Sequence, residues 1–220
     1  MYNKRMNAKE LHTKAEMTRE LEQDFLKSLQ FADEATLAYS QEGNTEGMAE
    51  IQGSRVLAFS HLAQKTDDKN YLVLAKHAAM AGVEIMPGAM TYFRLGKALE
   101  ETEDFSEAVS AYKSALEYEL PIEHNRPAVK SDLKAHLGFV EYLSGDKEQG
   151  LQDMDEAISE LEENSEELKY NRDVWLSGAY MRKAVVLKDK EALEKARDII
   201  YANPELVLRK GQLEKLASEI

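Results

Sequence analysis

Apolar residues recur every three to four positions along nearly the whole of this sequence, the spacing that one face of an α-helix requires. No stretch alternates apolar and polar residues well enough to form a half-buried strand. Only 4 prolines and 11 glycines occur among the 220 residues, so few positions interrupt long helices. The sequence therefore predicts an all-α protein with about ten or eleven helices of roughly 12–20 residues, joined by short turns.

Glycine and proline mark the expected ends of several helices. Gly43 and Gly145 are predicted to end helices, because glycine readily adopts the left-handed conformation that follows a last helical turn. Pro87 and Gly88 together predict a break between two helices, since proline removes a hydrogen-bond donor and glycine relaxes the backbone.

Polar residues before apolar runs mark the expected helix starts. Asp104 and Asp146 each have a Glu or Gln three residues later, which is the spacing of a capping box. Asn203 followed by proline predicts the start of the last helix. Near the N-terminus the periodicity predicts one helix across residues 11–29 and a second across residues 31–39.

Two stretches of the chain share the same order of small and large residues. In residues 89–122, the order is Tyr92, Leu95, Gly96 and Leu99, followed by Ala108, Tyr112, Ala115 and Pro121. In the second stretch, Leu137 and Gly138 are followed by Gly150, Met154 and Ala157. The interval from the glycine of the first helix to the small residue of the second is 12 in both. Small residues at matched positions indicate that the paired helices cross closely there.

This order resembles the tetratricopeptide-repeat (TPR) family, clearly over residues 89–162 and plausibly over residues 45–204. Leu99 and Lys134 stand where the family has aromatic residues. Gly96 and Gly138 are 42 residues apart, whereas the family repeat has about 34.

The resemblance implies antiparallel helix pairs stacked as a right-handed α-solenoid. Residues 1–44 would then form an N-terminal helical segment that caps the array or covers its groove. Residues 45–204 would form the repeat array and residues 205–220 a C-terminal capping helix, all in one continuous domain. The alternative is an irregular helical bundle whose matches arose by chance.

Members of this family bind partners in a concave groove lined by the first helix of each pair. The resemblance places six partner-binding residues there: Met90, Phe93, Lys97, Ala135, Phe139 and Tyr142. Glu100 and Asp132 lie one turn away. The family's lysine-and-asparagine clamp for a terminal carboxylate is absent, since only Lys97 would contribute. The apolar and aromatic residues instead suit an apolar or helical segment of a partner. Packing within the helix pairs, or against the N-terminal helix, is the alternative interpretation.

Charge and residue content narrow the classes of function. The net charge is −13, which disfavours nucleic-acid and membrane partners. Residues 141–170 carry eleven acidic side chains against Lys147 and Lys169. We interpret them as a solvated acidic face, with a surface that steers a basic partner as the alternative.

Several kinds of chemistry lack the residues they need. The chain has no cysteine, which excludes disulfides, thiolate metal sites and a cysteine nucleophile. The five histidines are scattered without metal-ligand spacing, and there is no phosphate-binding glycine loop or nucleophile elbow. We therefore expect no metal, no cofactor and no enzymatic activity. With no signal-peptide core and no run of eighteen apolar residues, the expected location is the cytoplasm.

The function predicted from the sequence is that of a protein-interaction adaptor or scaffold that holds a peptide segment of a partner. An intracellular chaperone or short-peptide sensor of the helical-repeat type is the alternative, and an enzyme with an unrecognised site is a third reading. The last helix keeps apolar residues such as Leu206 and Leu213, so it either docks on the array or forms a homodimer contact.

Overall fold

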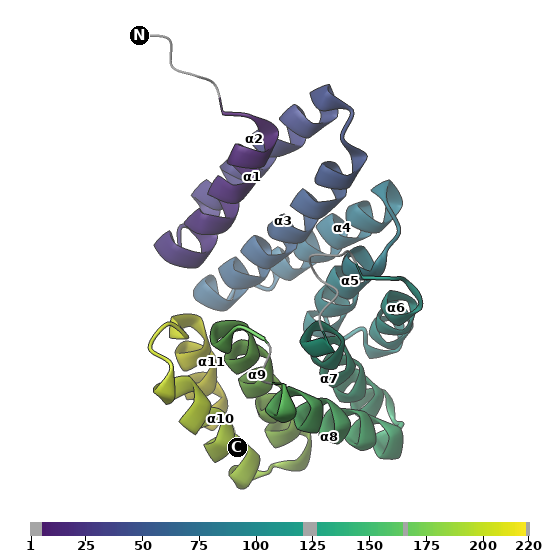
Figure 1. Ribbon diagram of the computed structural model, residues 1–220, viewed down its shortest axis with the longest axis vertical. Coiled ribbons are helices and arrows are strands. Elements are labelled where there is room, and N and C mark those ends of the chain that lie inside the picture. The colour runs from purple at the N-terminus through teal and green to yellow at the C-terminus, as the bar shows by residue number, and fades with distance from the viewer. Residues whose placement is uncertain (1–5, 121–126, 165–166, 219–220) are drawn as a thin grey trace. The chain divides into compact units, whose positions relative to one another are not determined.

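The computed structural model describes residues 6–120, 127–164 and 167–218, and it confirms the all-α prediction (Figure 1). These residues are 85% helical and contain no strand. The helices are α1 (Ala8–Met17), a π-helical turn η1 (Thr18–Glu22), α2 (Phe25–Glu42), α3 (Thr45–Thr66), α4 (Asn70–Ile85), α5 (Ala89–Glu101), α6 (Phe105–Glu117), α7 (Pro127–Ser144), α8 (Lys147–Glu163), α9 (Lys169–Leu187), α10 (Lys190–Ala202) and α11 (Val207–Ala217).

The chain forms two compact units, residues 1–119 (unit 1) and residues 120–220 (unit 2). Within each unit, helices that are neighbours in the sequence pack as pairs: α1 with α2, α3 with α4 and α5 with α6 in unit 1, and α7 with α8 and α9 with α10 in unit 2. The first helices of the pairs, α1, α3 and α5, also contact one another in turn. The helices α7, α9 and α11 do the same in unit 2. The neighbouring pairs agree with the sequence prediction, whereas the solenoid and the three-segment division stay predictions.

Glycines allow the paired helices to approach closely, as the matched small residues predict. A Cβ atom at Gly138 would lie 2.6 Å from the carbonyl oxygen of Gly150, and a Cβ at Gly150 would lie 2.5 Å from that of Gly138. At Gly96 a Cβ would lie 2.5 Å from the ring of Tyr112, which is fully buried. The α7–α8 crossing is therefore backbone against backbone, and the α5–α6 crossing is backbone against an aromatic ring. Pro121, which ends the first sequence match, lies outside the described residues.

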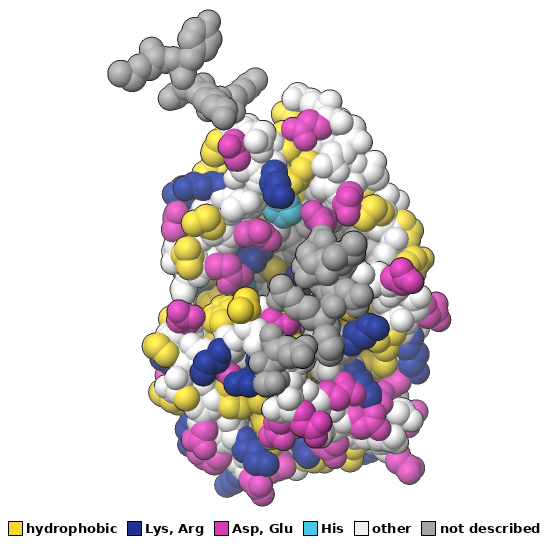
Figure 2. Space-filling model, in the orientation of Figure 1, with side chains coloured by type: hydrophobic (Ala, Val, Ile, Leu, Met, Phe, Trp, Pro, Cys, Tyr) yellow, Lys and Arg dark blue, Asp and Glu magenta, His cyan; other side chains and the backbone are white. Residues whose placement is uncertain are grey.

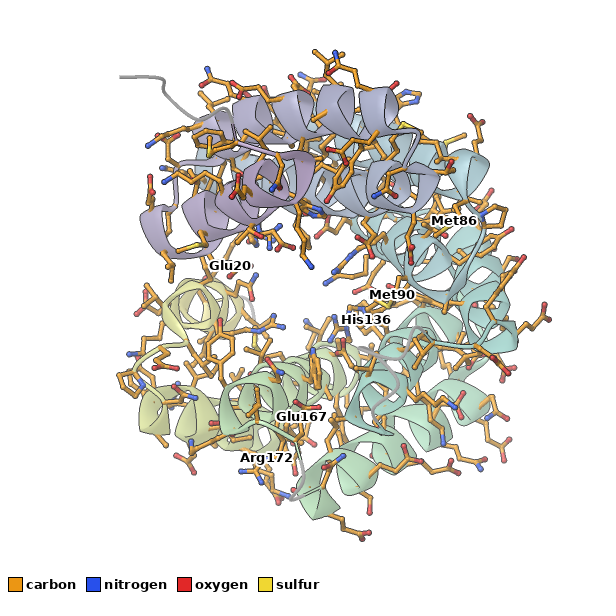
Figure 3. The ribbon with its side chains drawn as sticks, turned by 45° about the horizontal axis from the view of Figure 1, so that its top comes forward. Glu20, Met86, Met90, His136, Glu167 and Arg172 are labelled. Carbon is orange, nitrogen blue, oxygen red and sulfur yellow. The ribbon has the colours of Figure 1, made fainter. Side chains whose placement is uncertain are left out.

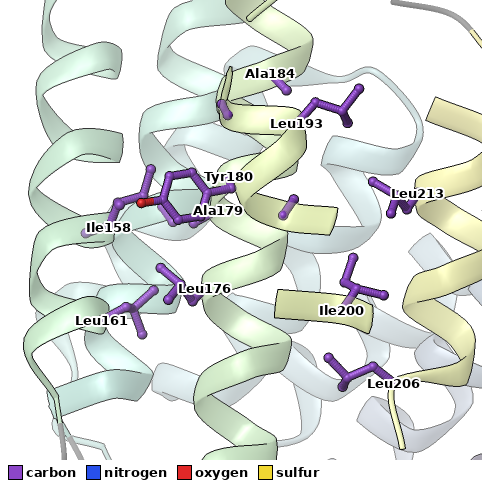
Figure 4. Close-up of a cluster of buried hydrophobic side chains, with 14 of the residues drawn as sticks. Ile158, Leu161, Leu176, Ala179, Tyr180, Ala184, Leu193, Ile200, Leu206 and Leu213 are labelled. Carbon is purple, nitrogen blue, oxygen red and sulfur yellow. The ribbon is translucent and has the colours of Figure 1, made fainter. Parts of the chain in front are cut away.

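A continuous apolar core joins the last four helices of unit 2 (Figure 4). Ile158 and Leu161 come from α8, Leu176 from α9 and Ile200 from α10, and all are buried. Leu206 and Leu213, beside and within α11, are each 2% exposed. Those two residues therefore dock the last helix onto its own unit.

The boundaries near the N-terminus differ from the prediction. A single helix across residues 11–29 is wrong, because the chain turns at Gln23, whose φ is 52°. Asp24 then caps α2 by accepting a hydrogen bond from the backbone N–H of Lys27, 3.1 Å away. The helical periodicity was continued by Leu21, which is 74% exposed and so belongs to no buried face.

Two predicted caps also differ. Asp104 precedes α6, but its side chain makes no capping hydrogen bond. Its carboxylate instead accepts from Lys76 Nζ at 2.6 Å and from Thr102 Oγ1 at 2.7 Å, and these bonds lower the pKa of Asp104. Asn203 accepts a hydrogen bond from the backbone of Glu205, but α11 begins only at Val207. The predicted breaks at Gly43, Gly145 and Pro87-Gly88 are confirmed.

We expect Gly138→Ala to destabilise unit 2 by about 1–3 kcal/mol, because the new methyl group meets backbone atoms that cannot move independently. Gly211→Ala is the matched control, since nothing lies within 4 Å of a Cβ there and alanine favours a helix by up to about 1 kcal/mol. Trp175, the single tryptophan, packs against the unit 2 core, so its fluorescence during urea unfolding reports both variants. Equal stability of the two variants would contradict the close α7–α8 crossing.

Candidate functional site

The first three predicted groove residues lie on α5 in unit 1. Met90 and Lys97 are half-buried, and Met90 lies near the start of the helix (Figure 3). Phe93 is only 5% exposed and packs against Tyr112 with ring centroids 5.9 Å apart. The cationic groups of Arg94 and Lys97 lie 5.8 and 6.0 Å from the centre of the Phe93 ring. The aromatic ring is therefore covered by cations on this part of α5.

The other three predicted residues lie on α7 in unit 2. Ala135 is fully buried, whereas Phe139 and Tyr142 are half-buried. Lys147 Nζ lies 5.5 Å from the centre of the Tyr142 ring. Each unit thus holds three of the six residues on one first helix, and their role in binding a partner stays a prediction. Phe93 and Ala135 are buried, so they add little to the accessible surface of α5 and α7. The side chains around them form that surface.

In unit 2, cationic side chains from two helices meet beside a histidine from a third. His136 of α7, labelled in Figure 3, is 2% exposed. Arg182 Nη2 of α9 lies 2.6 Å from its Nε2 and 2.8 Å from its Nδ1. The imidazole must be unprotonated at the nitrogen that accepts from the guanidinium. We call His136, Arg182 and Arg209 the arginine–histidine cluster.

Gly178 on α9 brings the two arginines of the cluster together. The position of a Cβ atom at Gly178 lies 3.0 Å from Arg209 Nη2 and 3.2 Å from Arg182 Nη1. Arg209 reaches this point from α11, and its Nη1 donates to Gln212 Oε1 at 2.7 Å. Both arginines are half-buried.

A buried carboxylate borders the cluster. Asp132, one turn before His136 on α7, is 6% exposed, and its Oδ1 lies 3.8 Å from His136 Nε2. Asp132 therefore offsets part of the positive charge from the α7 side.

Most acidic residues of the stretch 141–170 lie on α8, and carboxylates gather in the lower part of Figure 2. Lys134 of α7 donates to Glu156 and, at 3.5 Å, to Glu160. Lys183 of α9 donates to Asp155 at 2.6 Å. Burial opposes the charged form of Lys134, but its bonds to these carboxylates outweigh burial and raise its pKa. The acidic face predicted from sequence therefore also anchors lysines of the first helices.

Unit 1 has a histidine, a glycine and an arginine on α1, α3 and α5, as unit 2 has on α7, α9 and α11. His12 lies on α1, Gly53 on α3 and Arg94 on α5, and the three are equally spaced along the chain. A Cβ atom at Gly53 would lie 3.4 Å from Cγ and 3.5 Å from Nε of Arg94. In unit 1, Arg94 of α5 therefore lies across Gly53 of α3. In unit 2, Arg209 of α11 lies across Gly178 of α9 in the same way.

His12 belongs to a buried hydrogen-bond network rather than to an open surface. Its Nδ1 lies 3.2 Å from the hydroxyl of Tyr39 on α2, and its Nε2 lies 3.1 Å from Ser54 Oγ on α3. Burial lowers the pKa of His12, Glu16 raises it and Arg19 lowers it further, with a net lowering. Ser54 is 5% exposed, so this serine–histidine contact ties three helices together and leaves a substrate little access.

The π-helical turn of unit 1 holds a buried cation. Arg19 is 4% exposed, and its Nε and Nη2 donate to Glu20 Oε1 at 3.2 and 2.7 Å (Figure 3). Its Nη1 and the Oγ1 of Thr18 are buried without a hydrogen-bond partner in the described part of the chain.

The described residues contain no group of three or more side chains that could hold a metal ion. None of their helices has the length and apolar content needed to cross a membrane. No protein-family model matches the sequence, and no curated protein is detectably similar to it.

Sequence reasoning missed the arginine–histidine cluster. It treated His136 as one of five scattered histidines, and it placed neither Arg182 nor Arg209 in the groove. One signal was present: Gly178 and Arg182 are four residues apart, which puts them on one helical face. The convergence of Arg209 depends on how α11 packs, which local spacing does not reveal.

We expect the free energy of unfolding of unit 1 to decrease as the pH is lowered, because of His12. Its pKa is lowered on folding from the usual 6.5, so the folded state binds fewer protons. The contribution of the neutral imidazole is present above about pH 6.5 and is lost as pH falls through the folded pKa. Hydrogen exchange of α1–α3 between pH 7.5 and pH 5 measures this loss. His12→Gln should flatten the profile relative to the wild type.

The exposed His77 on α4 provides the matched control for this measurement. His77→Gln should leave the pH dependence of α1–α3 unchanged. A His12→Gln profile as steep as that of the wild type would show that other groups, and not His12, set the acid sensitivity.

Proposed function

We propose that this chain is a non-catalytic interaction module that holds an acidic segment of a partner protein on α7, α9 and α11 of unit 2. The observation that carries the proposal is the convergence of Arg182 and Arg209 at Gly178, beside His136. Two half-buried arginines that meet at one point favour a negatively charged ligand beside them. Arginine also forms planar, paired hydrogen bonds with carboxylates.

The distribution of charge within unit 2 supports an acidic ligand. Lysines of α7 and α9 that face α8 are paired with its carboxylates, as Lys134 and Lys183 show. The arginines of the cluster meet on the first helices, where each also takes part in further interactions. A strongly acidic protein repels acidic segments elsewhere on its surface, so a local cationic site confers selectivity.

The proposal keeps the scaffold role and the TPR-like interpretation of the helix pairs, and it changes the nature of the ligand. An apolar segment was expected because Phe93, Phe139 and Met90 were assigned to the groove. The burial of Phe93 removes one of these apolar side chains from the accessible surface of unit 1, and the arginines of unit 2 favour an acidic ligand there. A short acidic peptide sensed inside the cell would use the same side chains.

We expect a glutamate-rich peptide to bind the full-length protein, and a lysine-rich peptide of equal length to bind far more weakly. Fluorescence anisotropy of the labelled peptides measures both affinities, and the acidic peptide should weaken as salt increases. Arg209→Glu should weaken acidic-peptide binding by about tenfold or more, because it reverses one charge of the cluster.

Lys190→Glu on α10 makes the same charge change at an exposed position of a second helix. It should leave the affinity within about twofold of the wild type, apart from weak long-range effects. Equal binding of acidic and basic peptides, or equal losses in the two variants, would overturn the proposed binding face.

A further inference from the structure

We propose that the exposed side of α4 in unit 1 is the surface through which two copies of this chain associate. The inference goes beyond the proposed function and does not depend on it, because it concerns a helix of unit 1 alone. It rests on an apolar stripe that α4 exposes, and on a hydrogen-bond donor and an acceptor that lie within this stripe.

The helix α4 is apolar on both of its sides. Its buried side packs three alanines against unit 1: Ala75, Ala78 and Ala79. Its other side carries three large apolar side chains that are between 41 and 51% exposed: Val73, Leu74 and Met80. A surface helix normally has polar residues on the side that faces water, and a helix that is apolar all round is normally buried all round. The exposed side of α4 is therefore typical of a contact surface.

The exposed residues of α4 lie on one continuous helical face. They recur every three to four positions and form what we call the α4 stripe: Val73, Leu74, His77, Met80, Ala81 and Glu84. Single apolar side chains are common on protein surfaces, whereas a contiguous apolar patch marks an interaction site. The spacing therefore separates the α4 stripe from the scattered exposed residues of the other helices.

The low charge of the α4 stripe favours a second copy as the occupant. The chain has a net charge of −13, so two copies repel each other at long range. Glu84 is the only acidic residue of α4, whereas the exposed side of α8 carries Glu148, Glu156 and Glu160 among others. Two copies that meet through α4 therefore keep most of their carboxylates apart.

The α4 stripe is also complementary to itself about a two-fold axis, as a symmetric dimer interface must be. In an antiparallel pair whose axis passes between Met80 and Ala81, each long methionine faces the small alanine of the other copy. The same register sets His77 against Glu84, because the two residues lie equally far from the axis along the helix. Neither side chain has a hydrogen-bond or ion-pair partner among the described residues, and an imidazole N–H donates to a carboxylate.

The last helix is the weaker candidate for this contact. Its apolar residues Leu206 and Leu213 suggested a homodimer contact from sequence, but both are buried within unit 2. They are therefore not accessible to a second copy, whereas the α4 stripe is.

The test is sedimentation velocity of the full-length protein at concentrations from about 1 to 300 µM. One helix from each copy makes a small interface, so we expect a monomer–dimer equilibrium with a dissociation constant of about 1–100 µM. A strict monomer over the whole range would overturn the inference.

Two matched variants locate the contact. Met80→Glu should weaken association by about tenfold or more, because it places a carboxylate from each copy at the centre of the interface. Leu37→Glu makes the same kind of change at an exposed position of α2 and should alter the dissociation constant less than about twofold. Circular dichroism verifies that both variants are folded. Equal losses in the two, or undiminished association of Met80→Glu, would place the contact elsewhere and reject the α4 stripe.

A charge exchange tests the antiparallel register. His77→Glu sets two carboxylates against each other and should weaken association by about threefold or more. The double variant His77→Glu/Glu84→His keeps the net charge of the wild type and restores a carboxylate–imidazole pair, so it should recover most of the lost affinity. A double variant as weak as His77→Glu alone would refute the proposed pairing of His77 with Glu84.

Cross-linking gives a second measurement that does not depend on weakening the contact. The chain has no cysteine, so one introduced cysteine reports the proximity of two copies. Met80→Cys should give a covalent dimer with a short thiol-reactive cross-linker, and Leu37→Cys should give far less. Equal cross-linking of the two variants would count against the α4 contact.

Discussion

The structure depends on how closely the two helices of a pair can approach. At the α7–α8 crossing, neither Gly138 nor Gly150 has room for a side chain, because each faces the backbone of the other helix. At the α5–α6 crossing, the flat ring of Tyr112 fills the space above Gly96. These contacts set the spacing of each pair, and the spacing determines which side chains of the first helices come together on the neighbouring face. In unit 2 that face carries the arginine–histidine cluster, so the site is a consequence of the packing.

The second organising feature is the separation of charge between the two kinds of helix in unit 2. The helix α8 carries most of the acidic residues of the stretch 141–170, and part of them are paired with Lys134 and Lys183. Arg182 of α9 and Arg209 of α11 meet at Gly178, where the helix has no side chain of its own. A net charge of −13 therefore does not reveal that two arginines meet at one point. In the proposed function, this pair of arginines selects acidic ligands, which the rest of the acidic surface repels.

Periodicity and turn residues predicted the helices well, because both depend on local geometry. The breaks at Gly43, Pro87-Gly88 and Gly145 follow directly from the backbone preferences of glycine and proline. The N-terminal error arose because Leu21 continues the apolar period although it is exposed, and the turn at Gln23 has no glycine or proline to mark it. The site was predicted less well. Phe93 was placed on the groove by analogy, yet its ring lies beneath two cations. Arg209 could not be placed, because its position depends on how a separate helix packs.

The most direct test of the account is hydrogen–deuterium exchange of the full-length protein with and without a bound glutamate-rich peptide. Peptide-level exchange resolves each helix, so it locates the ligand without any substitution. If the first helices of unit 2 form the binding face, protection will concentrate in α7, α9 and α11, near His136, Arg182 and Arg209. The exchange of α8 and α10 will change little. Protection confined to α8 and α10, with the three first helices unaffected, would contradict the account.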